Sequence, residues 1–319
     1  MWRPDRSLRG PDRPALRDIE PLNRVFADAF TDRYSRDGLV GVRVPHLNKL
    51  VWRYAIEDAG HGAMVWRDGE GHMVAFNMVH QSGVEGWMGP LAVRPDRQGE
   101  GLGSTMVRIG IDWLKAQGVR TIGLETMPRT VENIGFYSRL GLVPGPLTVT
   151  LVHDVPRRAG VVPDLLSATG HPLESGVEEC RRLTDELAPG VDFSREITLT
   201  QELNIGDTTL VRERGELLAF ALWHSTPLAA GRAKDEVRVL KLVARSLPAF
   251  VRLLEALHGT AAVERVGRIA IRCQTEYAEA YLQLIAAGYR VHWTDLRMIL
   301  RELPQQPLRH GLVLSNWEI

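Results

Sequence analysis

The chain has 319 residues, with 39 basic and 39 acidic side chains. This length exceeds the size at which a single core usually stops growing, so we expect two domains of about 150 residues each. The balanced charge, without any block of one sign, argues against nucleic acid as a partner. The N-terminal stretch is polar, and no segment has the composition of a signal sequence or a membrane span, so we expect a cytoplasmic protein without a membrane partner.

The two cysteines, Cys180 and Cys273, lie far apart in the sequence and form no CxxC pair. This usage fits a reducing compartment and predicts neither a disulfide framework nor a zinc site. The ten histidines form no HExxH or similar ligand pattern. The sequence therefore implies no metal.

Apolar periodicity predicts a mixed α/β order of elements in the first half. Helices are expected over residues 18–30 and 47–57, and strands over residues 63–67, 72–80 and 84–93. Turn residues 68–71 join the first two strands into a hairpin. A helix from Gly103, a strand over 121–127, a short helix ending at Leu140 and a strand over 147–154 complete this half.

The same order of elements returns in the second half, with strands over 208–213, 217–224, 236–244, 268–274 and 289–300 and helices over 247–258 and 276–288. This order indicates a duplication with a period of about 150 residues. We predict an α/β fold of the mixed, α+β type. Its predicted parts are an N-terminal domain (1–155), a linker region with scattered Pro and Gly (156–189) and a C-terminal domain (190–319).

Residues 93–103 read Val-Arg-Pro-Asp-Arg-Gln-Gly-Glu-Gly-Leu-Gly and join a predicted strand to a predicted helix. Glycines at alternate positions let the backbone approach a ligand, and the free N–H groups of a helix start suit a pyrophosphate. The spacing fits neither a Walker loop nor a dinucleotide fingerprint. A plain connecting turn is the alternative, but Pro90 disrupts the preceding strand and favours a gap for an extended ligand.

The segment 87–144 resembles the GNAT superfamily of N-acetyltransferases. Gln98, Gly101 and Gly103 match its acetyl-CoA signature, Arg/Gln-x-x-Gly-x-Gly/Ala. Residues 133–142 resemble its second signature, a helix with a tyrosine, Tyr137, four residues before Gly141. The resemblance implies two tandem GNAT-like domains, each with a central, mostly antiparallel sheet, a splayed strand pair and flanking helices.

The resemblance also implies acetyl-CoA as the co-substrate. The residues expected to bind it are Leu91, Ala92 and Val93 along pantetheine, Gln98, Gly99, Gly101, Leu102, Gly103 and Ser104 at the phosphates, and Asn133 and Tyr137 on the second signature. Many family members place the asparagine seven residues before the tyrosine, whereas Asn133 stands four before it. A solvated helix residue is therefore the alternative for Asn133.

Acyl transfer to an amine needs an oxyanion stabiliser, a base for the amine and a proton for the leaving thiolate. By the resemblance, Tyr137 supplies that proton and the N–H of Ala92 or Val93 meets the oxyanion. Glu125 and Glu85 are the first candidates for the base, and His80 is a third. Each carboxylate has a structural alternative, since carboxylates are mostly solvated, and Tyr137 without the resemblance would be a core aromatic.

The second half has lost these features. Its counterpart of the loop, residues 243–248, contains no glycine, and aligning Gly288 with Gly141 places Leu284 where Tyr137 stands. We therefore expect a degenerate domain that packs against the first and shapes the acceptor cleft between them.

The expected function is N-acetyltransfer, directly from acetyl-CoA to an amine of a small molecule. By the resemblance, residues 28–48 contribute to the acceptor site. Two alternatives stay open: a non-catalytic CoA-binding sensor or scaffold, and a longer-chain acyl or O-acyl transferase. No pattern in the sequence identifies the acceptor or predicts an oligomeric state.

Overall fold

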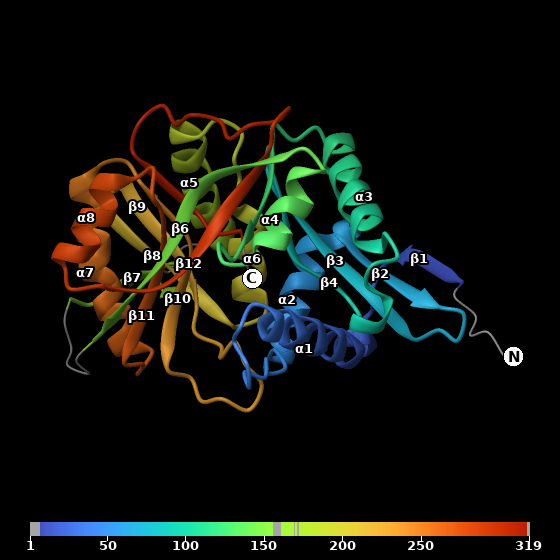
Figure 1. Ribbon diagram of the computed structural model, residues 1–319. Coiled ribbons are helices and arrows are strands. Elements are labelled where there is room, and N and C mark those ends of the chain that lie inside the picture. Colours follow the sequence, from blue (N-terminus) through green and yellow to red (C-terminus); the bar gives the residue numbers. More distant parts are fainter. Residues whose placement is uncertain (1–6, 156–160, 169, 171, 318–319) are drawn as a thin grey trace, which may run out of the picture.

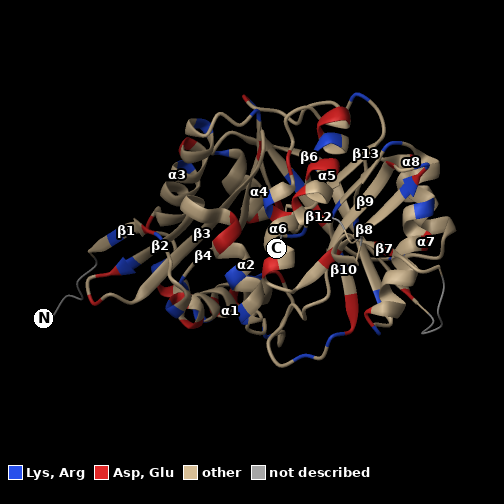
Figure 2. Ribbon diagram, turned by 180° about the vertical axis from the view of Figure 1, so that it is seen from behind, with Lys and Arg blue, Asp and Glu red and all other residues tan. Residues whose placement is uncertain are grey.

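The computed structural model of the protein describes residues 7–155, 161–168, 170 and 172–317. One long, curled β-sheet runs through the molecule, and helices cover both of its faces (Figure 1). Acidic and basic side chains alternate over the ribbon without a region of one sign (Figure 2). The predicted mixed α/β class is confirmed.

In the first half the predicted elements are present with small shifts of their ends. They are α1 (Ile19–Arg36), α2 (Lys49–Ala59), β2 (Ala63–Asp68), β3 (Met73–Ser82), β4 (Glu85–Val93), α3 (Leu102–Ala116), β5 (Thr121–Thr126), α4 (Val131–Ser138) and β6 (Leu142–Asp154). A short strand that the sequence pattern did not predict, β1 (Leu8–Asp12), pairs with β2 at the edge of the sheet.

The second half repeats this order, as predicted. Its elements are α5 (Leu173–Leu187), α6 (Ser194–Glu202), β8 (Gly206–Glu213), β9 (Glu216–His224), β10 (Glu236–Ala244), α7 (Leu247–Val263), β11 (Arg268–Gln274), α8 (Ala278–Ala286) and β12 (Arg290–Leu300). Two short strands complete it, β7 (Asp164–Leu165) and β13 (Leu312–Ser315).

The expectation of a linker over residues 156–189 needs correction. Helix α5 lies inside that range and presents Val177, Cys180, Leu183 and Leu187 to the core of the second half, where they pack against Phe220. These residues recur at the three- and four-residue spacing of a buried helix face. The Pro and Gly residues around the helix obscured that spacing in the sequence.

The two halves exchange strands at the centre of the sheet. The order there is β4-β5-β12-β6-β11-β10, so β12 of the second half lies between β5 and β6 of the first. In the same way β6 lies between β12 and β11. Each half therefore completes the sheet of the other, and the predicted pair of separate sheets is one continuous sheet.

The faces of the first half are covered by different helices. Phe76 and Met78 of β3 pack under α1 and α2, whereas Val79 and Met88 pack under α3 and α4. This arrangement follows from the two-residue alternation of a strand that is buried on both faces. The face on which a side chain lies therefore decides from which side of the sheet it can reach a site at the strand ends.

Candidate active site

The site begins where β4 and β5 separate. The two strands pair in parallel only from Glu85 to Met88 of β4. The next residues, Gly89 and Pro90, form a bulge, because the pairing of β4 with β3 shifts there before it resumes at Leu91. The last part of β4 has no partner on the β5 side, so a gap opens in the sheet, as Pro90 predicted.

Backbone N–H groups of β4 point into this gap. The N–H of Arg94 donates to the carbonyl of Val74 in β3 at 2.8 Å. Because successive N–H groups of a strand point to opposite sides, those of Leu91 and Val93 face the gap, and that of Ala92 faces β3. Of the two oxyanion donors considered from the sequence, the alternation favours Val93, and it adds Leu91.

The glycine loop follows β4 directly. Gly99 and Gly101 have φ of 80° and 81°, and a Cβ atom on either would meet nothing within 4 Å. The first helical hydrogen bond of α3 runs from Thr105 N–H to the Gly101 carbonyl at 3.1 Å, so the N–H groups just before Thr105 precede the helical ladder. Gln98 braces the loop, since its side-chain amide donates to the Val93 carbonyl at 3.0 Å.

A cavity of about 500 Å³ joins these features. It is lined by every residue that the sequence assigned to acetyl-CoA: Leu91, Ala92, Val93, Gln98, Gly99, Gly101, Leu102, Gly103, Ser104, Asn133 and Tyr137. It also reaches α1, which lies on the opposite face of the sheet from α3 and α4. The lining of the cavity therefore comes from helices on both faces of the sheet.

Sequence reasoning missed two groups in the cavity wall. Arg139, just beyond α4, is exposed and has no ion pair or hydrogen bond among the described residues, so its guanidinium is available to a phosphate. On α1, Arg33 bridges to α4 through Glu132 at 2.6 Å. The signal for Arg139 was its place two residues after Tyr137; nothing local in the sequence indicated the contact between α1 and α4.

Tyr137 lies at the inner end of the cavity. Its side chain is 8% exposed and packs edge-on against Phe136, with ring centres 5.0 Å apart. Its hydroxyl has no hydrogen-bond partner among the described residues, and burial raises the pKa of the phenol. The group therefore stays protonated at neutral pH and has a free donor, which a general acid requires.

The two candidate carboxylates are occupied elsewhere. Burial opposes ionisation of Glu125, but the charges of Arg272 and Arg297 outweigh it and hold the pKa of Glu125 below its usual value. Glu125 binds these arginines at 2.6 and 2.8 Å. Glu85 is buried at the other end of β4, where it accepts a hydrogen bond from Ser315 Oγ at 2.6 Å. Neither lines the cavity, and their contacts indicate structural roles.

The loop between α1 and α2 is held by the second half of the chain. Asn48 N–H donates to the Leu228 carbonyl, and Ala230 N–H donates to the His46 carbonyl, both at 2.8 Å. With these bonds, Leu47 and Ala229 form an isolated antiparallel β-bridge. The segment expected to contribute to the acceptor site is thus fixed in place by the loop that precedes β10.

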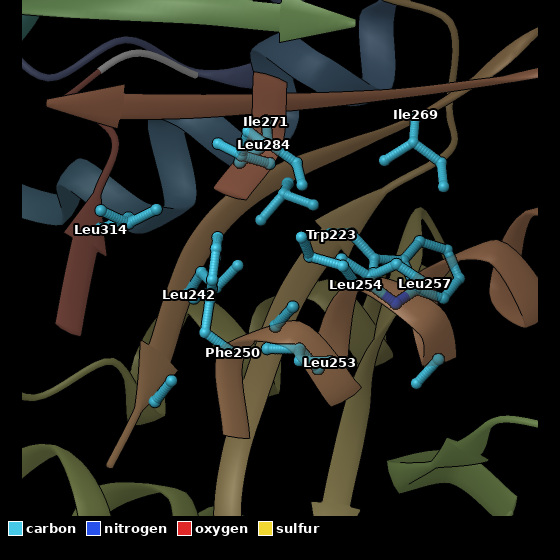
Figure 3. Packing of buried hydrophobic residues seen from close by; sticks show 14 of the residues in the cluster. Trp223, Leu242, Phe250, Leu253, Leu254, Leu257, Ile269, Ile271, Leu284 and Leu314 are labelled. Atoms are coloured by element: carbon cyan, nitrogen blue, oxygen red, sulfur yellow. The ribbon is translucent and has the colours of Figure 1, made fainter. Parts of the chain in front are cut away.

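The corresponding gap in the second half is filled by the chain itself. Strand β10 pairs with β11 only from Glu236 to Arg238, and β13 pairs with β10 from Lys241 to Ala244. Leu314 of β13 belongs to the core of this half together with Leu284 (Figure 3). At the start of α7, Ser246 Oγ accepts from the Ala249 N–H at 3.4 Å, so the side chain occupies the place of an anion.

Two kinds of feature are absent from the described part of the chain, a helix that could cross a membrane and a metal-binding group. Within residues 7–155, 161–168, 170 and 172–317, no helix has the length and apolarity needed to cross a membrane. The same part of the chain contains no group of three or more His, Cys, Asp or Glu side chains placed to hold a metal ion.

The chain matches known proteins in sequence and in fold. Residues 24–142 match the model of the acetyltransferase (GNAT) family. A Bacillus subtilis (strain 168) protein named "Putative ribosomal protein bS18-alanine N-acetyltransferase" is 24% identical over 132 residues, which is 41% of this chain and 78% of that protein. Residues 24–142 contain the glycine loop and Tyr137.

Solved structures match almost the whole chain. A "putative acetyltransferase" from Pyrococcus horikoshii has a TM-score of 0.66 and 17% identity, covering 99% of this chain and 96% of its own. A tandem GNAT protein from the clavulanic acid biosynthesis pathway has a TM-score of 0.59 and 14% identity, covering 94% and 100%. Saccharomyces cerevisiae N-myristoyltransferase with bound myristoyl-CoA has a TM-score of 0.64 and 10% identity, covering 96% and 80%.

The family model covers the glycine loop, the gap after Met88 and the tyrosine helix, and the likeness in fold extends over both halves. Residues 24–142 form a domain of the acetyltransferase (GNAT) family, and the chain as a whole has the fold of tandem GNAT proteins.

Proposed function

We propose that this protein is an N-acetyltransferase that moves the acetyl group of acetyl-CoA directly to the amine of a small molecule. The observation that carries the proposal is the cavity of about 500 Å³, in which the glycine loop, the gap and Tyr137 converge. On this proposal the pyrophosphate lies on the loop, pantetheine extends along Leu91 to Val93, and the thioester lies beside Tyr137.

The packing beyond the gap supports a short acyl group. His80 and Trp87 lie behind the bulge of β4, and they are 0% and 2% exposed. Trp317 packs beside Trp87 and is 1% exposed. Lengthening the acyl chain in this direction would require these large side chains to move, which is costly in a close-packed interior. An acetyl group requires no such movement.

In the proposed reaction the amine attacks the thioester carbonyl and forms a carbon–nitrogen bond. The carbonyl oxygen gains negative charge, and the N–H groups of Leu91 and Val93 are placed to stabilise it. The carbon–sulfur bond then breaks, and Tyr137 gives its proton to the thiolate of CoA. The amine loses one proton, and the products are an amide and free CoA.

We further propose that only the first half binds acetyl-CoA. Three features of the second half support this: β13 lies in its gap, Ser246 caps its helix, and Leu284 is buried where the tyrosine would stand. The remaining role of the second half is to hold the loop between α1 and α2, and so to shape the acceptor cleft.

The test is CoA release from acetyl-, butyryl- and myristoyl-CoA in the presence of an alkyl amine, an amino sugar, an amino acid and a peptide with a free N-terminus. Acetyl-CoA should be the best donor, with at least one amine acetylated. Binding of acetyl-CoA in calorimetry without turnover on any amine would favour the alternative, a CoA-binding sensor. Preference for myristoyl-CoA would contradict the short acyl group.

A further inference from the structure

We propose that His80, oriented by Asp58, is the base that takes the proton from the acceptor amine. The inference rests on the proposed acyl transfer. It supplies the base for the amine, a role that the contacts of Glu85 and Glu125 do not fit. It starts from a buried imidazole whose two nitrogens have different surroundings.

His80 lies on β3 and is 0% exposed. Its Nδ1 is 2.5 Å from Oδ2 of Asp58 on α2, and its ring stacks on Trp87 of β4 with centres 4.0 Å apart. Its Nε2 is buried and has no hydrogen-bond partner among the described residues. With the Nδ1 proton on the carboxylate side, Nε2 is the basic nitrogen, which is the tautomer that a proton acceptor needs.

The free nitrogen lies against the mouth of the gap. A Cβ atom on Gly89 would be 3.1 Å from Nε2, and Gly89 is the first residue of β4 beyond its last pair with β5. Gly89 is half-buried and, like His80, does not line the cavity, so the proton path runs past a backbone position without a side chain. Leu91, which lines the cavity, is two residues further, at most about 7 Å along an extended strand. A chain of two bound water molecules spans such a separation, because each hydrogen bond covers about 2.8 Å.

The acid and the base lie on opposite faces of the sheet. Tyr137 packs in the cluster under α3 and α4, beside the glycine loop, whereas His80 reaches Asp58 of α2 on the other face. The thiolate leaves toward the CoA side, and the amine must approach the carbonyl from the side that the thioester leaves open. A proton donor on the first face and a proton acceptor on the second meet both requirements.

Other charged groups lie near the dyad, and one oxygen of Asp58 and one of Glu196 have no hydrogen-bond partner among the described residues. Arg195 Nε of α6 lies 3.7 Å from Asp58 Oδ1. Lys241 of β10 lies over the far side of Trp87, 5.2 Å from its ring centre, and donates to Ser315 Oγ at 3.0 Å. Glu196 accepts from Ser82 Oγ at 2.5 Å and lies 4.0 Å from Lys241. Within this cluster His80 is the group with a free basic nitrogen at the gap.

The proton balance is simple. As the carbon–nitrogen bond forms, the amine proton moves to His80 Nε2 through bound water, and Asp58 stabilises the resulting imidazolium. Tyr137 donates its proton when the carbon–sulfur bond breaks. After the products leave, the proton on His80 returns to solvent and Tyr137 regains one, so both groups are reset.

The test compares His80→Gln and Asp58→Asn with His224→Gln, which removes a buried histidine of the second half that contacts Thr200 at 3.0 Å. At saturating acetyl-CoA and amine, kcat of His80→Gln should fall about 10²–10⁴-fold. The acidic limb of its pH profile should disappear, while its Kd for acetyl-CoA stays within twofold. Asp58→Asn should move that limb to lower pH, because the imidazolium loses its counter-charge.

Measuring the pH profile of kcat with two amines of different pKa separates a limb that belongs to the enzyme from one that belongs to the acceptor amine. Wild-type kcat and pH profile in a folded His80→Gln variant would overturn the proposal, and unchanged kcat is the result expected for His224→Gln. A second readout needs no turnover: deuterium exchange at His80 Cε1, measured by mass spectrometry, should slow when acetyl-CoA binds, and exchange at His224 should not. If the wild type binds acetyl-CoA but acetylates no amine, the proposed function fails. If deuterium exchange at His80 is the same with and without acetyl-CoA, the access of His80 to the gap is refuted, whatever the turnover.

Discussion

Replacing Tyr137 with phenylalanine removes one hydroxyl from the cavity wall and keeps the ring and its contact with Phe136. Because that hydroxyl has no hydrogen-bond partner among the described residues, the substitution loses none of the roughly 1 kcal/mol that a typical internal hydrogen bond contributes. The free energy of unfolding should therefore change by less than about 0.5 kcal/mol. Affinity for acetyl-CoA should stay within twofold.

The effect on catalysis should be much larger. Loss of a general acid lowers kcat about 10²–10⁴-fold, which corresponds to about 2.7–5.4 kcal/mol of transition-state stabilisation. This range exceeds the expected change in stability by several-fold, so the two roles of Tyr137 give different results. A purely structural role would leave turnover as unchanged as the unfolding free energy.

Tyr289→Phe is the matched control. Tyr289 is 2% exposed in the second half, its hydroxyl is also without a partner among the described residues, and burial raises the pKa of its phenol as it does for Tyr137. Both variants are measured by CoA release at saturating substrates and by urea unfolding. A folded Tyr137→Phe variant with the kcat of Tyr289→Phe would remove Tyr137 from the mechanism.

Three further predictions follow from the structure. Gly103→Glu, at an ordinary φ and with only an ordinary contact of its Cβ to Phe136, should abolish acetyl-CoA binding in calorimetry because its carboxylate repels the pyrophosphate. Gly267→Glu, at an open position in the second half, should bind normally. Titration with CoA should give one site per chain, and two equivalent sites would mean that β13 leaves its gap. Burial raises the pKa of the Cys180 thiol and raises that of Cys273 to about 12, so above pH 8.5 the unfolded chain releases protons that the folded chain retains. Stability should fall there by about 1.4 kcal/mol per pH unit for each thiol, and the Cys180→Ala/Cys273→Ala variant should show a flatter slope in urea unfolding between pH 8.5 and 10.

Local patterns in the sequence predict most of the fold, and the family resemblance assigns to acetyl-CoA residues that lie close together in the structure. The order of helices and strands follows from apolar periodicity, and the glycine loop is contiguous in the sequence. The residues assigned to acetyl-CoA line one cavity because the strand, loop and helix that carry most of them are consecutive. Tyr137 joins them through the next strand-helix unit.

The features that the sequence did not predict depend on contacts between distant segments. Glu125 has the position of a plausible base, but its role is set by Arg272 and Arg297, which are far away in the chain. The partner of His80, Asp58, is separated from it by a strand and a turn. No periodicity reports such pairs, since side-chain contacts between elements depend on the packing of the elements.

The exchange of β6 and β12 has the same origin. Both strands have the length and composition that a GNAT-like half requires, so their patterns are equally compatible with pairing inside one half. Which neighbour each strand takes is decided by register over the whole sheet. The exchange makes the two halves one cooperative sheet, and this explains why a half that has lost its glycine loop remains part of the molecule.

The fate of the two gaps follows from the cost of unpaired backbone groups. A strand that parts from its neighbour inside a sheet leaves N–H and C=O groups without partners, and buried groups of this kind are rarely left unsatisfied. In the first half these groups face a cavity that a pantetheine arm can fill, and the glycine loop at its end is open. In the second half β13 supplies the missing partners to β10, and no ligand is needed. Once a strand fills the gap, an open loop has no anion to hold. The absence of glycine from residues 243–248 and the presence of β13 therefore belong together, because both follow when a strand, and not a ligand, completes the sheet.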